Sequence, residues 1–503
     1  MTDTTQAAAH FALAGTQGRL ARRVLYKPTD GYFGDVNPIF AEGRFHLPYI
    51  FCVADDDDSL NGGWRGIDWA HVVTDDFATF ETLPLMIERG GPDDPDALAG
   101  AGSVIERGPG DYVAFYAGIN PEPLPGRPEQ VILRATSSDL VTWTKDPDFV
   151  LEADERWYER NCLRDPFVYR HGDGWRMLLA AQVHGGPVHR RGAIGLAASE
   201  DLDHWTFQEP LLSPGTTLTP ECPETFVDGD RHYLVYSTYS DRFATRYRVG
   251  AGPDGPWVAP ADDALESADI YAAKTVSDGH HRYLIGWLAT RAGDRDTGNR
   301  QWGGVLVAHR LETRDDGSLG EHMPEALADR FDLAQATFDP RVGDWDVADR
   351  SATFRGAGFG WASLGSLDET CLLEVDIDVH DQAEEVGIGL RSDSTFDQVY
   401  VIRLEPKHGR VVFDRRPHEI IIPFDPDGDR AYVTERDFEI ERPLHVVDGK
   451  AHVRVLLDGS AIVAYINDVA LSTRGYGRRT GEWGVFAAAG LASFSNPRFG
   501  RLR

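Results

Sequence analysis

The sequence predicts an all-β protein whose first two thirds form a β-propeller. Two observations indicate this architecture. Short runs rich in β-branched and aromatic residues follow one another between turn residues, and few helical patterns separate them. A Ser/Thr-x-Asp element with an aromatic residue four positions after the aspartate recurs at Asp76, Asp139 and Asp201, about 60 positions apart.

A repeat of this length with about four strands is typical of a propeller blade, because a single blade cannot bury both of its faces without neighbours. A degenerate fourth copy surrounds Trp257. Residues 30–335 would then hold about five blades, after an N-terminal extension at 1–29 and before a second domain at 336–503. A β-solenoid or an array of sandwiches is the alternative architecture.

Composition and charge exclude several classes of partner. The chain has 81 acidic and 50 basic residues and a formal net charge of −31, which disfavours binding to nucleic acid or to an anionic membrane. No secretion signal or long apolar run is recognisable, and the four cysteines are scattered singly. We therefore expect a soluble, cytoplasmic protein. The sequence makes no prediction of its oligomeric state.

Three carboxylates stand where apolar, strand-like runs begin. They are Asp35 in "GYFGDVNPIF", Asp165 in "LRDPFV" and Glu221 in "PECPETF". Taken alone, the Arg-Asp-Pro element is most often a turn. In a propeller, however, the innermost strand of each blade lines one central channel, so the first residues of different blades can converge. We expect these acids to open blades one, three and four.

These motifs together resemble glycoside hydrolase family 32, the β-fructofuranosidases that include invertases, inulinases and levanases. The resemblance rests on "GDVNP", "LRDPFV" and "PECPETF" in that order, followed by "DIYAAKT", "LIGWLAT" and "QWGGVLVAHRL". It implies a five-bladed propeller followed by a C-terminal β-sandwich. The alternating run "VRVLLDGSAIVAYI" near the C-terminus independently indicates strands.

The resemblance also implies roles for the three acids. Asp35 matches the family's nucleophile, Asp165 its transition-state stabiliser and Glu221 its general acid/base. The chemistry suits these residue types, since retaining hydrolysis needs one ionised carboxylate to attack the anomeric carbon and one carboxyl group to protonate the leaving oxygen. The implied activity is the release of fructose, or a related furanose, from fructosides or short fructo-oligosaccharides.

Further residues are predicted to contact the sugar, through the resemblance or through their chemistry. Gly34 departs from the family pattern, because the family has an asparagine immediately before the nucleophile. This departure puts the exact substrate in doubt more than the reaction. The predicted substrate-binding residues are Asn37, Trp64, Ser103, Arg164, Asp269, Tyr271 and Trp302.

We predict no metal and no cofactor, because the acidic run "VADDDDSLNGG" lacks EF-hand spacing. The only predicted partner is a small carbohydrate. Three alternative functions remain at this stage. The covalent intermediate could pass to another sugar, as in a fructosyltransferase. The protein could be an inverting furanosidase or another glycosidase resembling family 43, or a sugar-binding protein that has lost its chemistry.

Overall fold

The computed structural model describes residues 23–53, 66–123, 125–379, 384–418, 420–421, 433–434 and 439–503. Most regular structure in this part of the chain is β-strand, which confirms the all-β class. The chain divides into two compact units. The first ends at Ala289 and also includes Gln301–Leu319, whereas the second comprises Thr290–Arg300 and the chain from Gly320 onward. The domain boundary at residue 335 stays a prediction.

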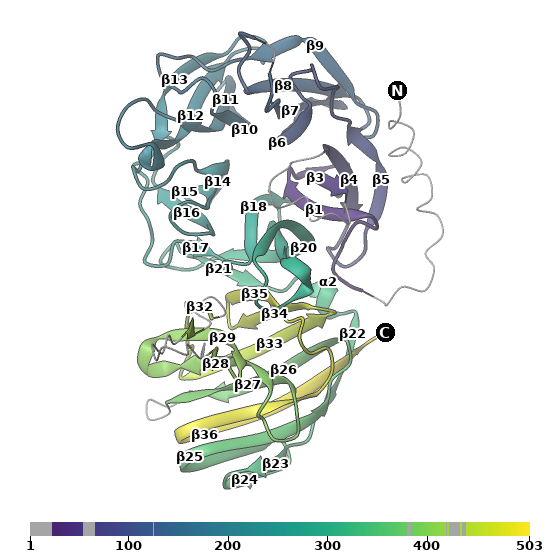
Figure 1. The fold of residues 1–503 in the computed structure, drawn as a ribbon, viewed down its shortest axis with the longest axis vertical. Coiled ribbons are helices and arrows are strands. Elements are labelled where there is room, and N and C mark those ends of the chain that lie inside the picture. Colours follow the sequence, from purple (N-terminus) through teal and green to yellow (C-terminus); the bar gives the residue numbers. More distant parts are fainter. Residues whose placement is uncertain are drawn as a thin grey trace, which may run out of the picture. The chain divides into compact units, whose positions relative to one another are not determined.

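The first unit is a β-propeller, and Figure 1 shows its blades side by side around a common centre. Blades 2, 3 and 4 are separate four-stranded antiparallel sheets, whereas blades 5 and 1 join where Phe33 pairs with Gly304. Blade 1 contains β1 (Gly31–Val36), β2 (Ile39–Ala41), β3 (Arg44–Val53), β4 (Ile67–Thr74) and β5 (Glu81–Ile87). Blade 2 contains β6 (Leu98–Gly108), β7 (Asp111–Ile119), β8 (Gln130–Ser137) and β9 (Thr144–Leu151).

The remaining blades have the same up-and-down order of strands. Blade 3 contains β10 (Leu163–His171), β11 (Gly174–Gln182), β12 (Gly192–Ser199) and β13 (Thr206–Leu212). Blade 4 contains β14 (Glu221–Asp228), β15 (Arg231–Thr238), β16 (Ala244–Gly250) and β17 (Ala264–Leu265). Blade 5 contains β18 (Ile270–Ser277), β19 (Arg282–Arg291) and β20 (Arg300–Thr313), with β21 (Leu319–His322) at its edge.

The recurring Ser/Thr-x-Asp element forms the same turn in three blades. Asp139 shows the pattern: its Oδ1 accepts the backbone N–H groups of Val141 and Thr142 at 2.9 and 2.7 Å. The residue after each aspartate has a positive φ, 57° at Phe77, 59° at Leu140 and 70° at Leu202. The turn joins the third strand of a blade to its outermost strand, so the repeat marks the blades as predicted.

The regular register is interrupted in all five inner strands. Such a β-bulge places an extra residue opposite one partner residue and re-aims the nearby side chains. In β10 the interruption contains Asp165, with φ of 55°, and Pro166, so this proline lies within a bulge where no ladder hydrogen bond is needed. The register shifts fall between Phe33 and Val36, Ala99 and Gly102, Arg164 and Phe167, Glu221 and Glu224, and Tyr271 and Lys274.

The second unit is the predicted β-sandwich. Its longest strand, β36 (Glu482–Leu502), pairs with four others and carries the buried Trp483. The strands are β22 (Phe331–Gln335), β23 (Asp339–Val342), β24 (Trp345–Val347), β25 (Ser351–Ser366), β26 (Thr370–Asp378), β27 (Glu385–Ser392), β28 (Val399–Glu405), β29 (Arg410–Arg416), β30 (Ile420–Ile421), β31 (Val433–Thr434), β32 (Ile440–Pro443), β33 (Lys450–Asp458), β34 (Ala461–Ile466), β35 (Val469–Arg474) and β36.

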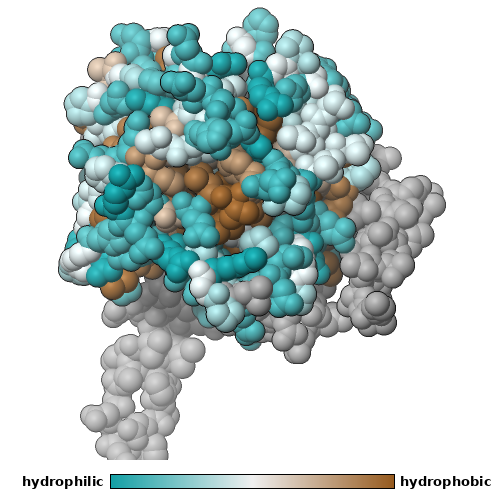
Figure 2. Space-filling model, turned by 90° about the horizontal axis from the view of Figure 1, so that it is seen from above, coloured by the Kyte–Doolittle hydropathy of each residue, from teal (hydrophilic) through white to brown (hydrophobic). Residues whose placement is uncertain are grey.

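Helices are short throughout the described residues. They are α2 (Glu325–Ala328) and the 3-10 turns Val188–Arg190, Ala292–Asp294 and Pro406–His408. None of the helices in this part of the chain has the length and apolar character needed to cross a bilayer. Hydrophilic residues cover most of the face in Figure 2, around a smaller hydrophobic area, which agrees with the high content of charged residues.

Candidate active site

The bulges bring the three predicted acids together from three blades. Asp35 lies on β1, Asp165 on β10, and Glu221 is the first residue of β14. The charges of Asp165 and Glu221 both act on Asp35 and raise its pKa. Three carboxyl groups far apart in the sequence therefore share one electrostatic environment.

Asp35 is half-buried and accepts the indole N–H of Trp287 at 2.8 Å through its Oδ1. Burial raises the pKa of Asp35 to about 7, and the two neighbouring carboxylates add to this effect. The Trp287 hydrogen bond and the charge of Lys274 oppose the rise. The carboxyl group can thus exchange a proton near neutral pH.

Arg164 links the other two acids. Its Nη2 donates to Glu221 Oε1 at 2.7 Å, and its Nε lies 3.9 Å from Asp165 Oδ2. Burial lowers the pKa of Arg164, but the charges of Glu221, Cys162 and Asp165, together with the hydrogen bond to Glu221, outweigh burial and keep this pKa well above the usual range. Asp165 also accepts the backbone N–H of Cys222 at 2.9 Å, and Cys222 has a φ of 49° in the bulge of β14. The guanidinium group fixes both carboxylates at once.

Aromatic side chains form the wall between Asp35 and Glu221. Tyr271 of β18 donates its hydroxyl to Glu221 Oε2 at 2.5 Å. Its ring stacks on Phe243, with centroids 4.2 Å apart, and meets Trp287 edge-on at 5.6 Å. Burial and the charge of Glu221 keep the pKa of Tyr271 well above its ordinary value, so this hydroxyl acts as a hydrogen-bond donor at any physiological pH.

Asn37 lies two residues after Asp35 and is only 1 % exposed. Its Oδ1 accepts the backbone N–H of Gly102 at 2.8 Å and the ammonium of Lys274 at 3.1 Å. Its Nδ2 has no hydrogen-bond partner among the described residues. Asn37 thus joins blade 1 to blades 2 and 5, and its contact with the sugar stays a prediction.

The other predicted subsite residues lie in different positions. Ser103 is buried, and its Oγ accepts the N–H of Val168 at 3.0 Å, which ties blade 2 to blade 3. Asp269 is buried just before β18, and its carbonyl oxygen accepts the N–H of Ala289 at 2.9 Å. Trp64 lies outside the described residues. The binding roles of all three stay predictions.

Trp302 explains the unusual residue before Asp35. A Cβ atom added at Gly34 would lie 2.2 Å from the Trp302 ring, far inside van der Waals contact. The Trp302 ring also lies against Trp287, with centroids 5.9 Å apart and the planes inclined by 54°. Glycine at position 34 therefore lets an indole approach the backbone beside Asp35, in the space that a side chain would otherwise take.

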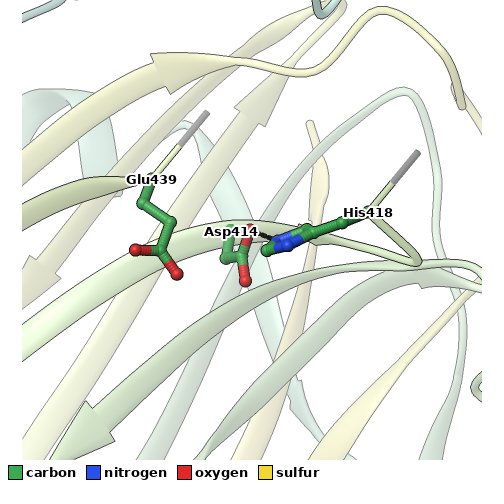
Figure 3. Close-up of side chains that lie close together, drawn as sticks. All are labelled: Asp414, His418 and Glu439. Carbon is green, nitrogen blue, oxygen red and sulfur yellow. Dashed lines mark hydrogen bonds and ion pairs between the residues drawn. The ribbon is translucent and has the colours of Figure 1, made fainter. Parts of the chain in front are cut away.

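Asp414, His418 and Glu439 in the second unit lie close enough together to suggest a metal site (Figure 3). Asp414 is fully buried, but it already accepts His418 Nε2 at 2.7 Å, Arg403 Nη1 at 2.6 Å and Arg416 Nη2 at 3.1 Å. Glu439 pairs with the same Arg403 at 2.7 Å. Arginine charges neutralise both carboxylates, so we do not assign a metal to this group.

Comparison with protein families decides the identity. The chain matches the glycosyl hydrolases family 32 N-terminal domain over residues 26–320 and the glycosyl hydrolases family 32 C terminal domain over residues 347–499. The chain belongs to glycoside hydrolase family 32. The resemblance inferred from the motifs is confirmed.

Individual relatives cover the whole chain. Sucrose-6-phosphate hydrolase of Escherichia coli is 24% identical over 491 residues, which span 92% of this chain and 91% of that protein. Among solved structures, sucrose-6-phosphate hydrolase from Lactobacillus gasseri has a TM-score of 0.72 at 18% identity. The match covers 100% of this chain and 97% of the Lactobacillus gasseri protein. The family 32 β-fructofuranosidase of Bombyx mori has a TM-score of 0.69 at 19% identity. The match covers 100% of this chain and 99% of the Bombyx mori protein.

As a family 32 enzyme, the protein is a retaining glycosidase that hydrolyses fructosides, and its substrates are small carbohydrates. Two residues that lower the pKa of Asp35, one through a hydrogen bond and one through its charge, were not predicted as site residues, although both lie in the quoted motifs. Trp287 belongs to "LIGWLAT" and Lys274 to "DIYAAKT". The bulges decide which side chains of these strands turn inward, and the motif "DIYAAKT" contains no proline or glycine signal that places the bulge of β18.

Proposed function

We propose that the protein releases fructose from sucrose, its 6-phosphate and short fructo-oligosaccharides, with Asp35 as nucleophile, Glu221 as acid/base and Asp165 as stabiliser. The observation that carries this assignment is the meeting of three carboxyl groups from β1, β10 and β14, joined through Arg164, Tyr271 and Trp287. Retaining hydrolysis requires two neighbouring carboxyl groups in different environments, one ionised to attack the sugar and one able to donate a proton.

In the first step an oxygen of ionised Asp35 attacks the anomeric carbon of the fructosyl ring. The bond from that carbon to the leaving oxygen breaks, and Glu221 gives its proton to this oxygen. Positive charge grows on the ring during the step, and Asp165, which is fixed by the Cys222 N–H, lies in the same group of carboxyl groups to stabilise it. A covalent fructosyl ester of Asp35 remains.

In the second step Glu221 takes a proton from water, whose oxygen attacks the anomeric carbon and displaces Asp35. The configuration inverts twice and is therefore retained. The hydrogen bonds from Arg164 and Tyr271 hold the two oxygens of Glu221 in place through both proton transfers. A sugar hydroxyl in place of water would give transfer instead of hydrolysis.

Tyr239 is the residue we place beside the leaving sugar. It follows β15 directly, where Ser237 pairs with Glu221, and it is 40% exposed. Burial of the ring, with the charge of Glu221, raises the pKa of Tyr239. An exposed aromatic ring next to the acid/base suits the apolar face of one sugar unit.

A cytoplasmic location is likewise a proposal. The four cysteines are free, three of them buried, as suits a reducing compartment. Fractionation of cells with an antibody to the protein would test it.

The function is tested with sucrose, sucrose 6-phosphate, inulin, levan and short fructo-oligosaccharides, with the anomer of released fructose followed by NMR. We expect retention, and at least a ~10³-fold loss of turnover in Asp35→Asn and Glu221→Gln with folding intact. Asp173→Asn, an exposed carboxylate in the turn after β10, is the matched control and should keep full activity. Inversion of the anomer, or near-normal turnover in Asp35→Asn, would refute the assignment.

Azide separates the two catalytic roles. In Glu221→Ala, azide should attack the covalent intermediate and give a fructosyl azide with the substrate's configuration. In Asp35→Ala it should attack the substrate directly and give the opposite configuration. If instead Asp35→Ala gave the retained azide and Glu221→Ala the inverted one, Glu221 would be the nucleophile and Asp35 the acid/base.

A further inference from the structure

Lys274 is a buried cation that the proposed chemistry does not use. It lies at the end of the bulge in β18 and is 1 % exposed. Its Nζ donates to the carbonyl oxygen of Gly102 at 2.6 Å and to Asn37 Oδ1 at 3.1 Å. Among the described residues no carboxylate forms a direct ion pair with it. A buried charge held only by neutral oxygens is costly for stability, which suggests that its position serves a function.

The contacts of Lys274 fix the segment that follows Asp35. Two donors, the Lys274 ammonium and the Gly102 N–H, converge on one atom of the Asn37 side chain, so that atom must be the amide oxygen. Asn37 lies two residues after Asp35, and its own N–H donates to the carbonyl oxygen of Pro48 at 2.7 Å. Lys274 of blade 5 therefore joins blades 1 and 2 at the segment that follows Asp35.

The charge of Lys274 acts in the same place as its hydrogen bonds. It lowers the pKa of Asp35, against burial and against the carboxylates of Asp165 and Glu221. It also lowers the pKa of two buried groups on β14, the Cys222 thiol and the Glu224 carboxyl group, whose pKa values burial raises. Glu224 in turn accepts the N–H of Thr275 at 2.8 Å and lies near Arg282. The Tyr271 hydroxyl, on the same strand as Lys274, is held by Glu221.

We propose that Lys274 is a positioning residue for Asp35, which orients the turn after it through Asn37 and keeps a positive charge near the three carboxyl groups. The inference rests on the proposed role of Asp35 as nucleophile. Its consequence is electrostatic: with Lys274 in place Asp35 remains an anion at a lower pH than the other two carboxylates would allow.

The test compares Lys274→Met and Lys274→Gln with the wild type on sucrose between pH 4.5 and 9. Methionine removes the charge and the hydrogen bonds, whereas glutamine keeps a donor and removes only the charge. We expect the acid limb of kcat/KM to move toward higher pH by about half a unit or more in both variants. The loss of kcat/KM should reach about 3-fold or more at pH 5.5, as a shift of half a unit implies, and shrink toward pH 8. Lys145→Met is the control, because Lys145 pairs with Asp96 at 2.6 Å on the outer strand of blade 2.

Three results would overturn the inference. They are an unchanged acid limb in Lys274→Gln, a loss of activity that is equal at all pH values, and a fall in the unfolding midpoint with normal kinetics. Each would reduce Lys274 to a structural residue. Failure of the proposed function itself is a separate observation, because it appears as normal turnover in Asp35→Asn, whatever the behaviour of the Lys274 variants.

Discussion

Trp287 donates its indole N–H to Asp35 Oδ1 at 2.8 Å. The two residues are far apart in the sequence, on β19 of blade 5 and β1 of blade 1. The hydrogen bond favours the ionised form of Asp35, and it lowers a pKa that burial has raised. It also fixes one oxygen of the carboxylate.

Trp287→Phe should therefore weaken the nucleophile without removing it. Phenylalanine keeps most of the aromatic surface against Tyr271 but donates no hydrogen bond. We expect kcat/KM to fall about 10-fold to 100-fold and its acid limb to move to higher pH. Steady-state kinetics across pH on sucrose measure both effects. Trp143→Phe is the matched control, since the Trp143 indole bonds to the Leu140 carbonyl oxygen in a blade-2 turn; an equal loss in that variant would contradict the explanation.

Arg164→Lys tests whether one guanidinium group must hold two acids. Arg164 lies 2.7 Å from Glu221 Oε1 and 3.9 Å from Asp165 Oδ2, and an ammonium group cannot reproduce this planar geometry. We expect kcat to fall by about 10²-fold, with a smaller change in KM, because both acids act in the transition state of the proposed mechanism. Arg176→Lys, at a partly exposed pair with Asp254, is the control. Wild-type kcat in Arg164→Lys would show that each acid is held independently.

The pairing of Gly34 with Trp302 predicts a rescue. A methyl group at position 34 would lie 2.2 Å from the Trp302 ring, so Gly34→Ala should lower the free energy of unfolding by about 1–3 kcal/mol and reduce turnover. Trp302→Ala opens that space. The double variant should be more stable than the sum of the single effects by about 0.5–3 kcal/mol, as measured by chemical denaturation. Strict additivity would mean that the two side chains do not compete for the same space.

The sequence predicted the architecture, and it predicted that three acids from different blades converge, because both follow from local signals; the catalytic roles of the acids stay a proposal. The Ser/Thr-x-Asp element recurs in the turns of three blades, and Asp35, Asp165 and Glu221 each stand in a motif that resembles the family's. It did not predict the contact of Trp287 with Asp35, or the contacts of Lys274 with Asn37 and Gly102. Those contacts join blades 5, 1 and 2, and they depend on register shifts that a single strand does not encode.

Asp35 should make the folded protein less stable as pH rises. The ordinary pKa of an aspartate side chain, which applies to the unfolded chain, is 3.8. In the folded protein the pKa of Asp35 is about 7, because burial disfavours the charged form. The folded state therefore binds the proton more tightly, and the contribution of Asp35 to stability is lost as pH rises from about 4 to about 7.

Asp35→Asn, which stays neutral, avoids this loss. We expect its free energy of unfolding to exceed that of the wild type by about 1–2 kcal/mol at pH 8 and to match it near pH 4. Urea denaturation at both pH values measures the difference, and Asp173→Asn, whose side chain is exposed, should show none. If Asp35→Asn raised the free energy of unfolding equally at pH 4 and pH 8, the ionisation of Asp35 would not be the cause of the destabilisation.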